Sequence, residues 1–155
     1  TCKEQGLEAS SPDVLFIVDT SGSNKETDCP SATGLHGEPY CAEQTMREQA
    51  MYRAIDRYKQ FSFENELSQQ KAPRVSIGYF PKKNDTNLLL DWQMIDSDYE
   101  YPASFQQDLQ HVTRFPKGAT PIDEGLDLAI KAFSRLSETN SDQNKKKVVV
   151  FIGDG

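Results

Sequence analysis

The hydrophobic residues of this chain form short continuous runs separated by stretches with helical spacing. The runs DVLFIV at 13–18 and VVVFI at 148–152 are apolar without alternation, which is typical of parallel strands buried on both faces. The segments RVSIGYF at 74–80 and NLLLDWQMI at 87–95 predict two further strands. Only a short polar turn joins these two, so we expect them to pair antiparallel.

Three helices are expected between the strands. From 42 to 61 the apolar side chains recur at helical spacing, which predicts an amphipathic helix with a core-facing stripe. The stripe consists of Met51, Ile55, Tyr58 and Phe61. A helix at 122–136, with Thr120 as N-cap and Pro121 at its first position, follows a shorter one at 104–112. Its predicted buried face consists of Ile122, Leu126, Ala129, Ile130 and Phe133.

The order of these elements predicts an α/β fold. Strands that alternate with helices favour a Rossmann-like open sheet, mostly parallel, with one antiparallel edge strand and helices on both faces. A chain of 155 residues suits one domain, spanning 1–155. The strand at 148–152 needs a covering helix, so we expect the domain to continue beyond this fourth strand. Residues 24–41 form a polar insertion, which we interpret as a loop.

Charge and hydropathy exclude some partners. The chain has 17 basic and 24 acidic side chains, a net charge of −7, which argues against nucleic acid as a partner. No apolar run approaches the roughly 20 residues of a membrane-spanning helix. An acidic chain is compatible with a site that attracts a cation.

The three cysteines, Cys2, Cys29 and Cys41, do not have the spacing of a zinc site. Cys29 and Cys41 flank the polar stretch CPSATGLHGEPYC, whose unfolded freedom a disulfide would restrict. We expect that bridge; the alternative is two reduced thiols in a cytosolic protein. Cys2 is left over and is expected to pair outside this sequence.

Oxygen-bearing side chains follow the first and last strands. Asp19 comes directly after the first apolar run, and Asp154 follows the last one after a single glycine. Ligands in open parallel sheets bind beyond the carboxyl ends of the strands. In an extended DTSGS segment, Asp19, Ser21 and Ser23 point the same way. With Thr120 at a helix start, this set suits Mg²⁺, with Mn²⁺ or Ca²⁺ as alternatives. Taken singly, each of these residues is also an ordinary turn or cap residue.

The low charge of this set has a consequence for recognition. If the hydroxyl groups bind directly and the carboxylates act largely through water, the ion stays under-neutralised. It can then accept an acidic group of a partner as its last ligand. Such a site recognises a carboxylate without performing chemistry on it.

DTSGS after an apolar strand, GATPI at a helix start and VVVFIGDG resemble the three parts of the metal-ion-dependent adhesion site of the von Willebrand factor type A family. The resemblance implies that Asp19, Ser21 and Ser23 supply the first part, Thr120 the second and Asp154 the third. It implies a non-enzymatic, Mg²⁺-dependent adhesion module. The partner is then a protein or matrix ligand with an exposed Asp or Glu, bound outside the cell or on a cell, matrix or pilus surface.

Two features depart from the family pattern. Family members usually continue with two more strands and their helices. The insertion at 24–41 is longer than in simple members, and we expect it on the metal face, where it shapes ligand choice. Its His36 and Glu38 are candidate ligand contacts, with plain solvent exposure as the alternative.

Two other functions remain open. A strand that ends in Asp also resembles haloacid-dehalogenase-like phosphotransferases, in which that Asp is the nucleophile. Their second acid lies two positions later, where this chain has Ser21. An intracellular scaffold with the same fold is the other alternative, and free thiols at Cys29 and Cys41 would favour it.

Overall fold

The computed structural model describes residues 11–24, 32–35, 38–41, 44–81, 87–114, 118–119, 121–138 and 145–153. Six strands, three helices and a short 3₁₀ turn are formed by these residues. The elements are β1 (Asp13–Asp19), β2 (Ala32–Leu35), β3 (Glu38–Cys41), α2 (Met46–Glu64), η1 (Gln69–Lys71), β4 (Arg74–Phe80), β5 (Leu88–Met94), α3 (Ala103–Arg114), α4 (Ile122–Glu138) and β6 (Lys147–Ile152).

The main sheet has the strand order β5-β4-β1-β6. Strand β1 runs parallel to both of its neighbours, β4 and β6, and β5 pairs antiparallel with β4 at the edge. The predicted open, mostly parallel sheet with one antiparallel edge strand is therefore confirmed. Because β1 is central and fully buried, its carboxyl end lies between the ends of two parallel neighbours.

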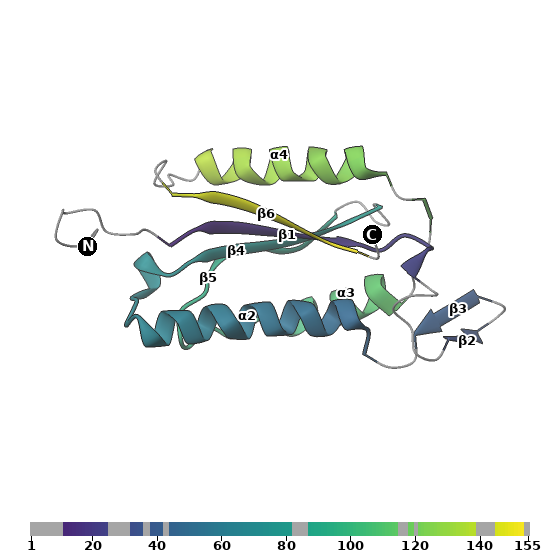
Figure 1. The fold of residues 1–155 in the computed structure, drawn as a ribbon, viewed down its shortest axis with the longest axis horizontal. Coiled ribbons are helices and arrows are strands. Elements are labelled where there is room, and N and C mark those ends of the chain that lie inside the picture. The colour runs from purple at the N-terminus through teal and green to yellow at the C-terminus, as the bar shows by residue number, and fades with distance from the viewer. Residues whose placement is uncertain are drawn as a thin grey trace.

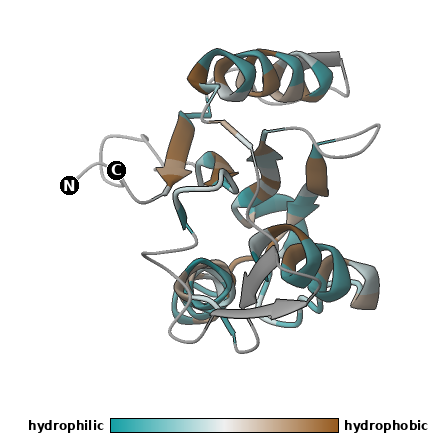
Figure 2. Cartoon of the chain, turned by 90° about the vertical axis from the view of Figure 1, so that its right-hand side faces the viewer, coloured by the Kyte–Doolittle hydropathy of each residue, from teal (hydrophilic) through white to brown (hydrophobic). Residues whose placement is uncertain are grey.

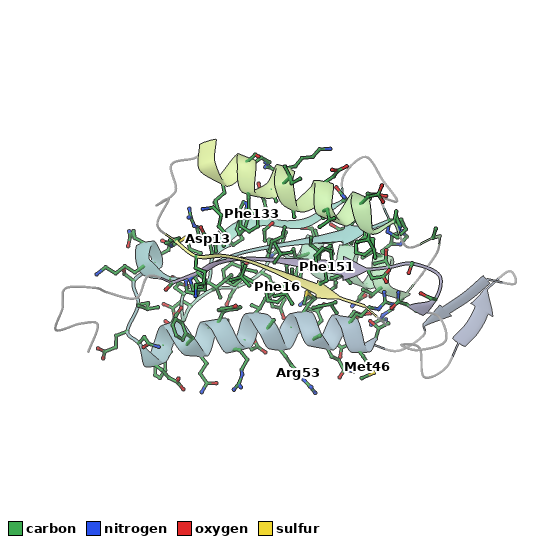
Figure 3. The ribbon with its side chains drawn as sticks, turned by 45° about the horizontal axis from the view of Figure 1, so that its top comes forward. Asp13, Phe16, Met46, Arg53, Phe133 and Phe151 are labelled. Atoms are coloured by element: carbon green, nitrogen blue, oxygen red, sulfur yellow. The ribbon has the colours of Figure 1, made fainter. Side chains whose placement is uncertain are left out.

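Helices cover both faces of this sheet, as predicted. Helices α2 and α3 lie on one face and α4 on the other (Figure 1). On the α2 face, Phe16 points from β1 towards α2 (Figure 3) and packs edge-on against Tyr58, with ring centroids 6.3 Å apart. Arg53 points away from the sheet on the outer side of α2. The apolar stripe of α2 therefore faces the core through Met51 and Ile55, while Phe61 lies more than a third exposed.

Strand β6 differs from its prediction as a strand buried on both faces. Its residues alternate between exposed and half-buried, and Phe151 is 45% exposed. The physical reason is its place at the margin of the sheet, where β1 is its only paired strand among the described residues. Figure 2 shows this marginal strand as strongly hydrophobic.

Helix α4 is rotated relative to the buried face that its sequence predicted. Ile122, Leu126 and Ile130 are all more than half exposed, so their placement in the core was wrong. The line of the helix that faces the sheet carries mostly small residues. A Cβ at Gly125 would lie only 3.1 Å from the ring of Phe151, so the small residues allow a close approach to the sheet. The buried positions are Gly125, Leu128, Ala129, Ala132 and Leu136.

The insertion contains a β-hairpin where the sequence predicted a loop. Strands β2 and β3 pair antiparallel, with Leu35 opposite Glu38. Gly34 and Pro39 lie inside these strands. Because both residue types are depleted in strands, the sequence predicted a loop here. It projects from the end of the molecule at which β1 ends (Figure 1). The expected position of the insertion on a metal face stays a prediction.

The buried hydroxyl of Tyr99 should make the stability of the fold depend on pH in the alkaline range. Its hydroxyl is buried without a hydrogen-bond partner among the described residues, and burial raises its pKa to about 12. Between pH 10 and 12 the unfolded chain loses the phenol proton while the folded chain keeps it. The free energy of unfolding therefore falls as pH rises through this window, and the titration of Tyr99 does not change it below pH 10.

Tyr99→Phe should raise the free energy of unfolding by about 1 kcal/mol near neutral pH, because it removes an unsatisfied buried group. In urea titrations at a series of pH values, the free energy of unfolding of the variant should also fall less steeply above pH 10 than that of the parent. Part of that loss remains, since burial also raises the pKa of Tyr52 and Tyr58. A variant with the same alkaline slope as the parent contradicts the assignment.

Candidate functional site

The turn that follows β1 brings three predicted site residues together. The carboxylate of Asp19 is buried, and its Oδ1 accepts the backbone N–H of Ser21 at 2.8 Å. The hydroxyl oxygens of Ser21 and Ser23 lie 3.2 Å apart. This contact confirms the expected convergence of the two serine side chains, while the carboxylate binds the backbone at the first of them.

Two residues that the sequence did not single out fix the shape of this turn. Thr20 donates both its backbone N–H and its hydroxyl to the carbonyl of Phe80, at 2.8 and 3.1 Å. The buried amide of Asn24 donates to the carbonyl of Ser21 at 3.2 Å. The turn is therefore attached to the end of β4 and closed on itself.

Two glycines from distant segments lie directly against the turn. The N–H of Gly22 donates to the carbonyl of Gly118 at 2.8 Å, and Gly118 has a left-handed backbone with φ 93°. At the end of β6, a Cβ on Gly153 would lie 2.9 Å from the Cβ of Asp19. Only a residue without a side chain fits so close to that carboxylate.

Gly118 precedes Thr120 by two positions, and Gly153 directly precedes Asp154. Thr120 and Asp154 themselves lie outside the described residues. The described backbone on the amino side of each therefore contacts the turn of Asp19, Ser21 and Ser23.

A buried polar network lies beneath the turn at the start of α2. Arg47, nearly fully buried, donates to the carbonyl of Asp19 at 2.6 Å and to the carbonyl of Thr113 at 2.8 Å. Glu48 is fully buried and accepts from Arg114 at 2.8 Å and from the hydroxyl of Thr113 at 3.0 Å. The network joins the end of β1, the first turn of α2 and the last turn of α3.

The start of α2 is set by a capping box. The side chain of Thr45 accepts the N–H of Glu48, and Glu48 accepts the N–H of Thr45 in return. The helix predicted at 42–61 therefore begins later, at Met46, and the Thr45-x-x-Glu48 spacing is the sequence pattern that marks this start. The burial of Arg47 could also have been predicted from the sequence, because Arg47 lies four positions before Met51 and so continues the apolar stripe of α2. A charged residue in register with a buried stripe indicates a buried charge.

The donor atoms of the turn fit a hard divalent cation. Adjacent ligands of octahedral Mg²⁺ at about 2.1 Å lie about 3.0 Å apart. The separation of 3.2 Å between the two serine hydroxyls is close to that edge. Within the described part of the chain, no three side chains of His, Cys, Asp or Glu gather as a metal-binding group. A site here would depend on Asp19, on the hydroxyl oxygens of Ser21 and Ser23, and on Thr120 and Asp154.

The structure describes only some of the other predicted site residues. Cys29 and His36 lie outside the described residues, as does Cys2. Cys41 and Glu38 are placed by their backbone in β3, but their side chains are not described. The predicted disulfide and the predicted ligand contacts therefore stay predictions. In the described ranges, no helix has the length and apolarity needed to cross a bilayer.

Comparison of the chain with protein-family models, curated proteins and solved structures finds no match.

Proposed function

We propose that this chain is a module of the von Willebrand factor A type that binds Mg²⁺ and through it a carboxylate of a protein or matrix partner. Asp19, Ser21 and Ser23 would hold the ion together with Thr120 and Asp154. The observation that carries the proposal is the turn after β1, where two hydroxyl oxygens 3.2 Å apart lie next to a buried carboxylate.

The surroundings of the turn support the same proposal. Gly118, two positions before Thr120, and Gly153, directly before Asp154, both contact the turn, which supports the proposed roles of Thr120 and Asp154. When bound, the ion supplies a positive charge that a partner's Asp or Glu can complete. The direct protein ligands would be neutral hydroxyls, with the carboxylates acting largely through water, which would leave the positive charge available to the partner.

The partner-facing side of the module follows from this placement. The β2–β3 hairpin projects from the end of the molecule at which β1 ends (Figure 1), which supports its role in ligand choice. We propose an extracellular or cell-surface location, on a cell, matrix or pilus surface. Alkylation of native protein followed by mass spectrometry tests it: modified thiols at Cys29 and Cys41 would favour an intracellular scaffold instead.

Calorimetric titration of the folded protein with Mg²⁺ and Mn²⁺ tests the metal site. The parent chain should take up one ion, and 100 times Kd of Mg²⁺ should stabilise it by about 2.7 kcal/mol. Asp19→Ala should weaken binding by at least the roughly 10–100-fold typical of outer-shell substitutions, because it also removes the acceptor for the N–H of Ser21. Asp91→Ala is the matched control, since Asp91 is an exposed carboxylate on β5 that pairs with Arg135; it should bind as the parent does.

The adhesion step is tested with immobilised acidic proteins. Binding should disappear with a chelator and with Asp19→Ala, and it should survive in Asp91→Ala. A parent chain that takes up neither metal rules out the site. Metal uptake with adhesion that survives the chelator leaves the site intact and removes its proposed role in adhesion.

A further inference from the structure

The guanidinium of Arg47 is buried in an unusual place for a cation. It lies in the first turn of α2, where the N-terminal end of the helix dipole disfavours positive charge. Burying a charge is costly unless it is well hydrogen-bonded. The reason for an arginine here must therefore lie in its contacts with other elements rather than in α2 itself.

Two of those contacts, among the described residues, are with backbone carbonyls of distant segments. One is the carbonyl of Asp19 at 2.6 Å, and the other is the carbonyl of Thr113 at 2.8 Å. Thr113 lies in the last turn of α3, whose terminal carbonyls lack partners within the helix. The planar fork of an arginine can donate to both carbonyls at once, which a lysine ammonium does less well.

Each carbonyl belongs to a segment of the proposed metal site. Asp19 begins the turn that carries the serine hydroxyls. The end of α3 leads to Gly118, whose carbonyl accepts from Gly22 at 2.8 Å, and then to Thr120. The two segments are thus linked twice, once through Arg47 and once through the Gly22–Gly118 hydrogen bond.

We propose that Arg47 is a positioning residue of this site, which fixes the spacing between the Asp19 turn and the segment that leads to Thr120. The inference rests on the proposed metal function. Arg47 acts through the backbone, with no contact to the ion required. Replacing Arg47 should leave the donor atoms of the site present but poorly placed. The affinity for Mg²⁺ should therefore fall, while the protein still folds.

The test compares Arg47→Met with Arg74→Met in Mg²⁺ calorimetry on folded protein. Arg74 is a suitable control because it pairs with the fully buried Asp13 at 2.8 Å, at the opposite end of β1. Arg47→Met should raise the Kd for Mg²⁺ by about 10–100-fold, the range for groups that orient metal ligands. Arg74→Met should lower the melting temperature but leave Kd unchanged.

Arg47→Lys provides a second variant if the methionine variant does not fold. It keeps the charge and can reach one carbonyl, so it should recover part of the affinity that Arg47→Met loses. Parental Kd in Arg47→Met, or in Arg47→Lys if only that variant folds, overturns the positioning role while the metal site stands. A parent chain without Mg²⁺ uptake removes the proposed function and the inference together.

Discussion

Replacing Glu48 with alanine is expected to lower the free energy of unfolding by about 3–5 kcal/mol, the range for breaking a buried ion pair. Glu48 is fully buried, and it accepts two hydrogen bonds from Arg114 and one from the hydroxyl of Thr113. The variant leaves Arg114 partly buried without its carboxylate. It also removes half of the capping box with Thr45.

Urea denaturation of Glu48→Ala, Arg114→Ala and the double variant measures this loss and the coupling between the two residues. The hydrogen bond to Glu48 raises the pKa of Arg114 above its ordinary value, so Arg114 keeps its charge throughout the accessible pH range. Their coupling energy should fall in the upper half of the usual range of about 0.5–3 kcal/mol for contacting residues.

The exposed pair of Asp91 and Arg135 is the matched control. Its N···O distance is 2.7 Å, close to the 2.8 Å of the buried pair, but both of its side chains are more than half exposed. Solvent screening should limit its coupling to about 0.2–1 kcal/mol. Equal coupling in the two pairs contradicts the view that burial gives the Glu48 pair its strength.

The fold class could be predicted because it depends on local patterns. The apolar runs of β1 and β4 identify strands whatever lies around them, and the short link after β4 predicts an antiparallel neighbour. The burial of β6 could not be predicted in the same way. Its residues VVVFI are as apolar as those of β1, and only the strand order shows that one is central and the other marginal.

The candidate site was predictable to the same extent. The spacing of Asp19, Ser21 and Ser23 is a local property, and the structure places all three in one turn. The contacts of Arg47 are not local, because its two carbonyl partners lie 28 and 66 positions away. No single-sequence pattern specifies such pairs; the position of Arg47 in an apolar stripe indicates only that it is buried.

Phe105→Ala should weaken the apolar attachment of α3, as Glu48→Ala weakens the polar one. Phe105 is 1% exposed, and its ring packs edge-on against Tyr52 and Tyr101 with centroid distances of 6.3 and 5.6 Å. Truncating a buried phenylalanine costs about 3–5 kcal/mol through lost burial and the cavity left behind. We therefore expect a fall of that size in the free energy of unfolding, measured by urea denaturation.

Phe63→Ala is the control for this change, because Phe63 lies on α2 with 71% of its surface exposed. It should alter the free energy of unfolding by no more than about 0.5 kcal/mol. A loss of less than about 1 kcal/mol in Phe105→Ala would mean that α3 is only loosely packed on α2 and the sheet. The polar contacts of Glu48 with Arg114 and of Arg47 with Thr113 would then be the main attachment of α3.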